Sequence, residues 1–332
     1  MFSPGILALT ASSAVVAPIM IYASGVGVTI LRGWDLESGS ETQLKLERKT
    51  FLVTTLVSCV MAYQIFALFM FVYTTDHLHS SFIGTMCAAG TLNVNPYGYP
   101  TLHVKMVNAM LCGLWLVLNY TDGQAYDYPL IRPKYRLLLI VAALLLIETF
   151  LQLKYLTGLR PDIISSCCGI LFGDTERSFT GAQVFLSSRT SKVLFYGSLV
   201  LVFGAGTRFL IHRRLGGVFS LLSVWQLLVS LVAVISFISV YYYELPTHHC
   251  PFCLLQREVH FIGYPLYASL LLGVIAGASV GMLKPFASHA SLAEIIPRLQ
   301  RRLCALSLAC LLVFAAVSTY PILFSEFKLE GY

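Results

Sequence analysis

Long, uninterrupted runs of apolar residues constrain this chain more than any other feature of its sequence. A helix needs roughly 20 such residues to cross the hydrocarbon core of a bilayer. Of the 332 residues, 57% are hydrophobic and only 11% are charged, less than half the charged share usual in a soluble domain. One water-soluble core of this size could not enclose so much apolar surface. Backbone groups in hydrocarbon must be hydrogen-bonded within their own segment, so these runs predict membrane-spanning helices.

We therefore predict an all-α, polytopic membrane helix bundle of about eight transmembrane helices. It forms a single integral membrane domain over residues 1–332, with no soluble domain. The spans are expected near residues 5–31, 50–75, 104–121, 136–157, 191–211, 218–243, 258–283 and 303–324. The first run has no basic segment before it and no small-residue cleavage site, so it is interpreted as a span rather than a signal peptide. Membrane lipid is the predicted surrounding.

Basic residues are divided unevenly between the two sets of loops. Fourteen of the 22 lysines and arginines lie in, or at the edges of, the loops after the first, third, fifth and seventh spans: Arg32, Lys45, Arg48, Lys49, Arg132, Lys134, Arg136, Arg208, Arg213, Arg214, Lys284, Arg298, Arg301 and Arg302. Basic loops stay in the cytoplasm, so both termini and the opposite loops are predicted to be extracytoplasmic. The net charge of +6 is modest and confined to short loops, and it indicates membrane orientation rather than a nucleic-acid partner.

Five of the nine cysteines lie outside the apolar runs, in the loops predicted to be extracytoplasmic. They are Cys87, Cys167, Cys168, Cys250 and Cys253. Three cysteine loops follow one another at nearly equal spacing, in FIGTMCAAG, IISSCCGIL and THHCPFCLL, each between two apolar runs. The pattern predicts three repeated hairpins of helix, cysteine loop and helix.

The strongest motif is Cys250-Pro251-Phe252-Cys253. On the first turn of a helix, a Cys-x-x-Cys pair brings two sulfurs within disulfide reach, and the helix N-terminus stabilises a thiolate. Such a pair either cycles between dithiol and disulfide or binds a soft metal. A disulfide that closes so short a loop stabilises a fold little, so we favour chemistry over a structural bridge at this pair.

The segment around this motif, about residues 241–283, resembles the disulfide-generating membrane protein DsbB. It is more distantly similar to vitamin K epoxide reductases. In DsbB a Cys-x-x-Cys pair opens a transmembrane helix, with an arginine at the offset of Arg257 beside a quinone. The resemblance covers about a tenth of the chain. It implies that Cys250 and Cys253 are redox-active, that Arg257 faces a quinone, and that an extracytoplasmic thiol protein is the partner.

The chain also departs from that pattern. It has more spans than DsbB, and the second cysteine pair of that family has no counterpart that can be matched residue by residue. The remaining loop cysteines are Cys87 and the adjacent Cys167 and Cys168. Neighbouring cysteines form only a strained disulfide, so a bridge from Cys87 to either of them is the alternative.

A soft-metal site is the competing interpretation. The vicinal Cys167-Cys168 is similar to a feature of mercuric-ion transporters, and thiolates select copper(I), zinc and mercury. Cys87, Cys167, Cys168, Cys250 and Cys253 offer enough sulfur for a tetrahedral copper or zinc site, and His248, His249, His77 or His79 could complete it. A third interpretation is a non-enzymatic membrane subunit of a larger complex, in which the loop cysteines form one or two structural disulfides.

Glu148 is a carboxylate near the middle of the fourth predicted span, with Gln152 one turn further on. A charged group inside the membrane is costly and marks either a functional site or a paired structural one. Two interpretations are equally supported: Glu148 is structural, either protonated or paired with a neighbouring helix, or it takes part in proton or quinone chemistry. On balance the sequence predicts a membrane thiol:disulfide oxidoreductase that couples an external dithiol to a quinone.

Overall fold

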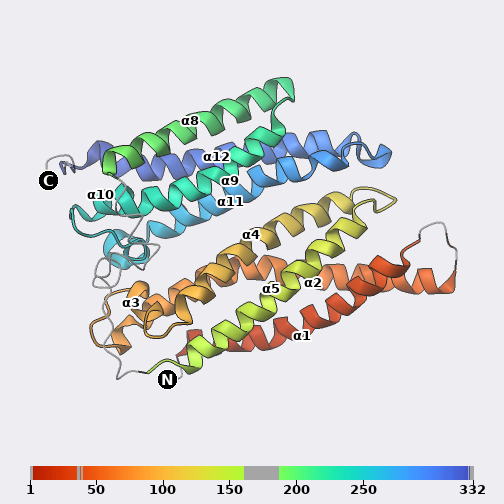
Figure 1. Cartoon of the computed structure of the whole chain (residues 1–332), viewed down its shortest axis with the longest axis horizontal. Helices are drawn as coiled ribbons and strands as arrows, with labels where there is room; N and C mark the ends of the chain where they lie inside the picture. Colours follow the sequence, from red (N-terminus) through yellow and green to blue (C-terminus); the bar gives the residue numbers. More distant parts are fainter. Residues whose placement is uncertain (1–2, 36–37, 39, 161–186, 328, 330–332) are drawn as a thin grey trace. The chain divides into compact units, whose positions relative to one another are not determined.

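The structure is a computed structural model, which describes residues 3–35, 38, 40–160, 187–327 and 329. In this part of the chain all regular structure is helical, and eight helices are long and apolar enough to cross a membrane. The all-α polytopic prediction is therefore confirmed (Figure 1). The long helices are α1 (Pro4–Gly33), α2 (Glu41–His77), α4 (Gly98–Asp122), α5 (Ile131–Thr157), α8 (Ser188–His212), α9 (Gly216–Ala233), α11 (Gly263–Met282) and α12 (Ile295–Phe324).

Three shorter elements complete the helical segments relevant to function. Helix α9 continues through one π-helical turn (Val234–Ile238) into α10 (Ser239–Tyr243), so a single span covers Gly216–Tyr243. Helix α3 (Ala88–Leu92) follows the first cysteine loop. The seventh span was expected from residue 258, whereas α11 begins at Gly263.

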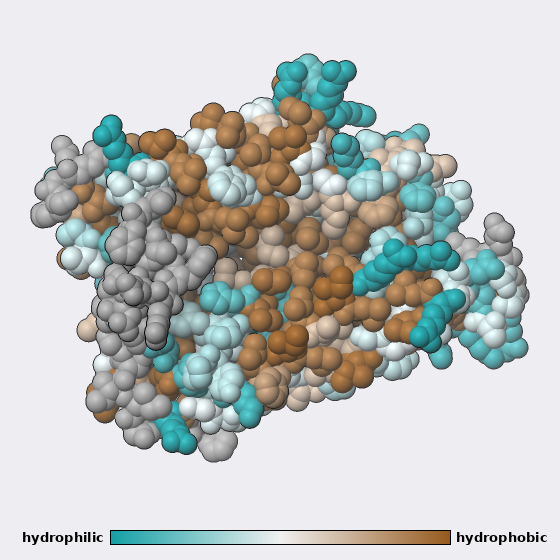
Figure 2. Space-filling model, in the orientation of Figure 1, coloured by the Kyte–Doolittle hydropathy of each residue, from teal (hydrophilic) through white to brown (hydrophobic). Residues whose placement is uncertain are grey.

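Hydrophobic side chains cover the sides of the long helices, and hydrophilic ones gather toward the helix ends and loops (Figure 2). Large apolar residues such as Val200, Leu221 and Leu323 are more than two-thirds exposed. In water this exposure would be strongly unfavourable, but against lipid it costs nothing, as expected for spans in contact with the bilayer. The protein is an integral membrane protein.

The chain divides into two compact units. Unit 1 comprises Met1–Thr75, Leu92–Arg160 and Phe286–Ile296, and unit 2 comprises Asp76–Thr91, Pro161–Pro285 and Pro297–Tyr332. In unit 1, α5 packs against both α1 and α4. The buried aromatic residues Trp115 and Tyr135 fill its core, and the Trp115 Nε1 donates to the Lys134 carbonyl at 3.1 Å.

Two buried ion pairs join α4 to α5, one in the middle of α5 and one on its first turn. Lys105 Nζ lies 2.6 Å from Glu148 Oε1, and the Asn108 amide donates to the other carboxylate oxygen. Lys134 Nζ lies 2.5 Å from Asp122 Oδ2. All four charged side chains are almost wholly buried. Of the interpretations of Glu148, its pairing with a neighbouring helix is the one that these contacts support. Lys134, counted above as a loop charge, is neutralised by Asp122.

Unit 2 is built around α11, the most buried of the eight spans. Gly273, Gly277 and Gly281 lie four residues apart and let neighbouring helices approach closely. A side-chain carbon at Gly277 would lie 2.3 Å from Ser223 Oγ of α9 and 2.9 Å from Ser307 Oγ of α12. Small residues at such spacing allow close packing where no hydrophobic effect drives helices together. This packing fixes α11, and α11 in turn supports the cysteine loop that precedes it.

Candidate functional site: a buried cluster of three cysteines

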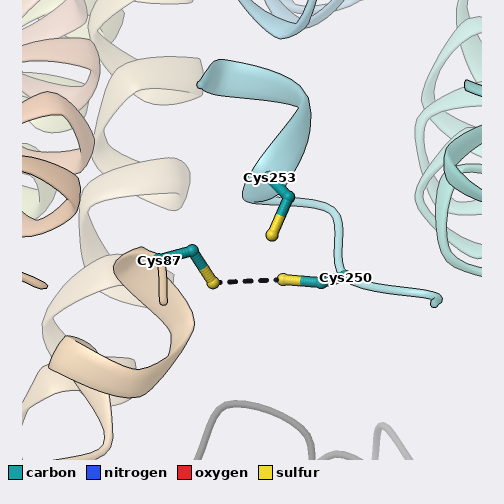
Figure 3. A group of neighbouring side chains, drawn as sticks. All are labelled: Cys87, Cys250 and Cys253. Atoms are coloured by element: carbon teal, nitrogen blue, oxygen red, sulfur yellow. Dashed lines mark hydrogen bonds between the residues drawn. The ribbon is translucent and has the colours of Figure 1, made fainter. Parts of the chain in front are cut away.

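Three cysteine sulfurs from two distant loops of unit 2 meet in one cluster (Figure 3). Cys87 directly precedes α3, and Cys250 and Cys253 lie between α10 and α11. Their sulfurs all lie within 4.8 Å of one another, and Cys87 Sγ is 3.5 Å from Cys250 Sγ. The side chains are 0%, 3% and 8% exposed for Cys87, Cys250 and Cys253. We call these three residues the cysteine cluster.

The backbone of the Cys250–Cys253 loop is held from both neighbouring spans. The Tyr243 hydroxyl, at the end of α10, donates to the Cys250 carbonyl at 2.8 Å. The Tyr267 hydroxyl, on the first turns of α11, donates to the Pro251 carbonyl at 2.7 Å. These bonds satisfy two backbone acceptors in a largely buried loop, where an unsatisfied carbonyl is costly. The two tyrosines therefore fix where the Cys250 sulfur lies.

The expectation that this pair lies on the first turn of an α-helix is wrong. Cys253 begins a short 3-10 turn (Cys253–Leu255), after which Gln256 is extended. His260 and Phe261 then have φ values of 54° and 55°, a left-handed conformation that a continuous α-helix does not allow. Helix α11 consequently starts ten residues after Cys253, and its N-terminus is not what polarises the thiols.

The loop nonetheless stays close to the start of α11. A side-chain carbon at Gly263 would lie 2.9 Å from the Leu254 carbonyl group. Only a residue without a side chain permits this approach of α11 to the 3-10 turn. Gly263 therefore helps to place Cys253.

Cys87 is positioned by a clamp that reaches across from the other loop. The Gln256 Nε2 donates to the Met86 carbonyl at 2.7 Å and lies 3.4 Å from Asp76 Oδ1. The same Asp76 oxygen accepts the Ala88 N–H at 3.1 Å. Met86, just before Cys87, is therefore hydrogen-bonded to Gln256 directly. Ala88, just after Cys87, is linked to Gln256 through Asp76. We call Asp76 and Gln256 the amide clamp.

The surroundings of Cys250 favour its thiolate. Hydrogen bonds from the thiols of Cys253 and Cys87, aided by the backbone N–H groups of Phe252 and Cys253, lower the pKa of Cys250 well below its usual range, despite burial. The pKa of Cys253 is raised, chiefly because its thiol donates to Cys250. Burial, followed by the neighbouring His249, lowers the pKa of His248. The thiolate is thus stabilised by S–H and N–H donors rather than by an imidazolium at His248.

We expect the substitution Cys87→Ala to raise the pKa of Cys250 in the reduced, metal-free protein. The alanine removes an S–H donor that stabilises the thiolate, so the thiolate is lost at a higher pH as the solution is acidified. Cys87→Ser keeps a hydroxyl donor and should raise this pKa less. The ultraviolet absorbance of the thiolate against pH measures both, after subtraction of the same variant carrying Cys250→Ala. An unchanged titration in Cys87→Ala would contradict the proposed stabilisation.

The other predicted site residues lie outside the cluster. The His248 ring packs edge-on against Tyr243 at 4.6 Å between centroids, and His249 Nδ1 is 2.9 Å from the Ile235 carbonyl within the π-helical turn. Arg257 lies on a second 3-10 turn and is exposed, not one α-helical turn below Cys253. Glu148 belongs to unit 1 and is paired with Lys105. Cys167 and Cys168 lie outside the described residues.

Sequence reasoning missed the residues that support the cluster. Tyr243, Tyr267, Asp76 and Gln256 were not predicted as site residues. A weak signal was present, because Asp76 and Gln256 are polar residues close to two of the cysteine loops. The hydrogen bond between them spans 180 positions of the chain, and no local pattern predicts it.

The chain matches no protein-family model, no curated protein and no solved structure. Its chemistry must therefore be inferred from the cluster itself.

Proposed function

We propose that this protein is a membrane thiol:disulfide oxidoreductase whose reacting pair is Cys250 and Cys253. The observation that carries the proposal is the packing of these two sulfurs within one buried cluster, at most 4.8 Å apart. Small side-chain rotations bring thiols at this distance to the ~2.05 Å of a disulfide. The lowered pKa of Cys250 supports the proposal, because the thiolate is the reactive form of cysteine.

The exchange reaction starts from the Cys250–Cys253 disulfide. A thiolate of an external dithiol attacks Cys253, forms a mixed disulfide and releases Cys250 as a thiolate. Attack at Cys253 is favoured because the sulfur with the lower pKa leaves faster, and Cys253 is also the more exposed of the two. The second thiol of the dithiol then displaces Cys253, which leaves an oxidised partner and a reduced Cys250–Cys253 pair.

Reoxidation of the pair removes two electrons and two protons, and we propose a membrane quinone as the class of acceptor. The resemblance to DsbB motivates this choice. Of the two residues expected to contact a quinone, Arg257 is exposed and Glu148 is paired with Lys105. We also propose that the cluster lies on the extracytoplasmic side of the membrane, where an external thiol protein is its partner.

The redox state of the pair in isolated membranes tests the function. We expect Cys250 and Cys253 to be oxidised when a soluble quinone is supplied and reduced when dithiothreitol is added without quinone. Alkylation of free thiols with a mass tag, followed by peptide mass spectrometry, reports each cysteine separately. Cys59, a thiol exposed on the side of α2, should be alkylated in both conditions once the membranes are dissolved in a denaturing detergent. A pair that remains in one state under both conditions would refute the oxidoreductase proposal.

A further inference from the structure

We propose that the reduced cysteine cluster is also a binding site for one soft d10 metal ion, with copper(I) as the matching ion. Cys87, Cys250 and Cys253 would each contribute one sulfur. Among the described residues they are the only group of three or more histidine, cysteine, aspartate or glutamate side chains close enough to share an ion. This inference does not rest on thiol exchange, in which Cys87 is not a reacting group.

The spacing of the sulfurs fits a three-coordinate ion. A metal–sulfur bond of about 2.3 Å places the three sulfurs of a trigonal site ~4.0 Å apart. The observed sulfurs lie within 4.8 Å of one another, with the closest measured pair at 3.5 Å. Adjustments of a few tenths of an ångström would therefore suffice for binding, and neither loop needs to refold.

The two loops that carry the sulfurs are held independently of any ion. Tyr243 and Tyr267 fix the backbone at Cys250 and Pro251, and the amide clamp fixes the residues on both sides of Cys87. A site held in this way loses little conformational entropy when it binds an ion, which favours affinity. The hydrogen-bonding residues around ligands commonly tune metal affinity.

The donor set and its burial favour a soft ion. The cluster contains sulfur only, whereas magnesium and calcium require oxygen ligands. Structural zinc sites are almost always four-coordinate, and the described cluster offers three ligands. Copper(I) is stable with three sulfurs, and the buried position limits its contact with water and oxidants. Binding replaces the thiol protons, which are released to solution.

The metal-bound state and the disulfide state exclude each other. A Cys250–Cys253 disulfide removes two of the three ligands, so only the reduced cluster binds the ion. Oxidation of the pair would release it. The same three sulfurs thus link metal binding to the redox state of the protein.

Anaerobic titration of the purified, reduced protein with copper(I) against a competing chelator tests the site. We expect one ion per chain, with X-ray absorption showing three sulfur ligands and no nitrogen or oxygen ligand. Cys87→Ser should lower the affinity by more than roughly 100-fold, above the loss typical of a supporting residue, and leave two sulfurs. Cys59→Ser is the matched control and should bind as the unmodified protein does.

A second pair of variants tests the amide clamp without touching a ligand. Gln256→Ala should lower copper(I) affinity by roughly 10–100-fold while the sulfur count stays at three. Gln300→Ala is the control, because Gln300 in the same unit also donates to a backbone carbonyl, that of Val280 at 2.7 Å. Equal affinity in Cys87→Ser and the unmodified protein, or tighter binding of zinc than of copper(I), would overturn the proposal. A protein that binds no copper(I) but still cycles its disulfide would overturn the metal site alone.

Discussion

Replacement of Cys250 by alanine is expected to abolish disulfide turnover, with a loss of roughly a thousandfold or more, as for other covalent nucleophiles. Cys250 leaves as a thiolate when the Cys250–Cys253 disulfide is opened. The same thiolate displaces a partner that is disulfide-bonded to Cys253. Without it, Cys253 has no partner sulfur in its own loop. Turnover is measured as oxidation of dithiothreitol coupled to reduction of a soluble quinone in detergent-solubilised protein.

The same variant should accumulate a trapped intermediate. When Cys250→Ala is combined with Cys87→Ala, which removes the other nearby thiol, incubation with glutathione disulfide is expected to leave glutathione covalently attached to Cys253, whereas Cys250 displaces it in the unmodified protein. Intact-protein mass spectrometry detects the adduct. Cys59→Ala, which removes an exposed thiol on α2, should behave as the unmodified protein in both assays. Normal turnover in Cys250→Ala would show that the chemistry does not use this pair.

Replacement of Lys105 by alanine is expected to destabilise unit 1 by about 3–5 kcal/mol, the cost of leaving one partner of a buried ion pair uncompensated. Lys105 is the only cation within 4.0 Å of the Glu148 carboxylate among the described residues, and both side chains are at most 5% exposed. The free energy of unfolding in detergent, followed by helical circular dichroism, measures the effect at neutral pH.

Two companion variants separate the charge effect from the loss of packing. Lys105→Met with Glu148→Gln removes both charges and keeps side chains of similar length, so we expect it to recover most of the loss. Lys45→Ala breaks the exposed pair between Lys45 and Glu41, four residues apart at 2.6 Å, and should cost no more than about 0.5 kcal/mol. A double variant as unstable as Lys105→Ala would contradict an electrostatic origin.

The transmembrane helices could be predicted from the sequence because the signal is local. Each apolar residue of a span such as Pro4–Gly33 adds to the transfer free energy of that span, whatever lies next to it. The eight predicted spans and the eight observed ones therefore agree apart from their ends. Ends are decided by short-range backbone geometry, as at His260 and Phe261, whose left-handed conformations delay α11 to Gly263.

The partner of Glu148 could not be predicted in the same way. A buried carboxylate demands compensation, but Lys105 lies 43 positions earlier in the chain, and no local pattern links the two residues. Only the packing of α4 on α5 brings the two side chains together. The same holds for Lys134, which looks like a loop charge in the sequence and is buried against Asp122 in the structure.

The sequence by itself determined that this is a polytopic helical membrane protein and that Cys250 and Cys253 are close enough to react, because both properties depend on neighbours along the chain. Only the tertiary structure decided that Cys87, 163 positions from Cys250, joins them as a third sulfur, and that His248, His249 and Arg257 do not. Such a contact depends on the packing of α11 and on the Asp76–Gln256 hydrogen bond, which no local pattern encodes. The physical reason is that hydropathy adds up residue by residue, whereas the placement of a side chain is decided by the whole packed unit.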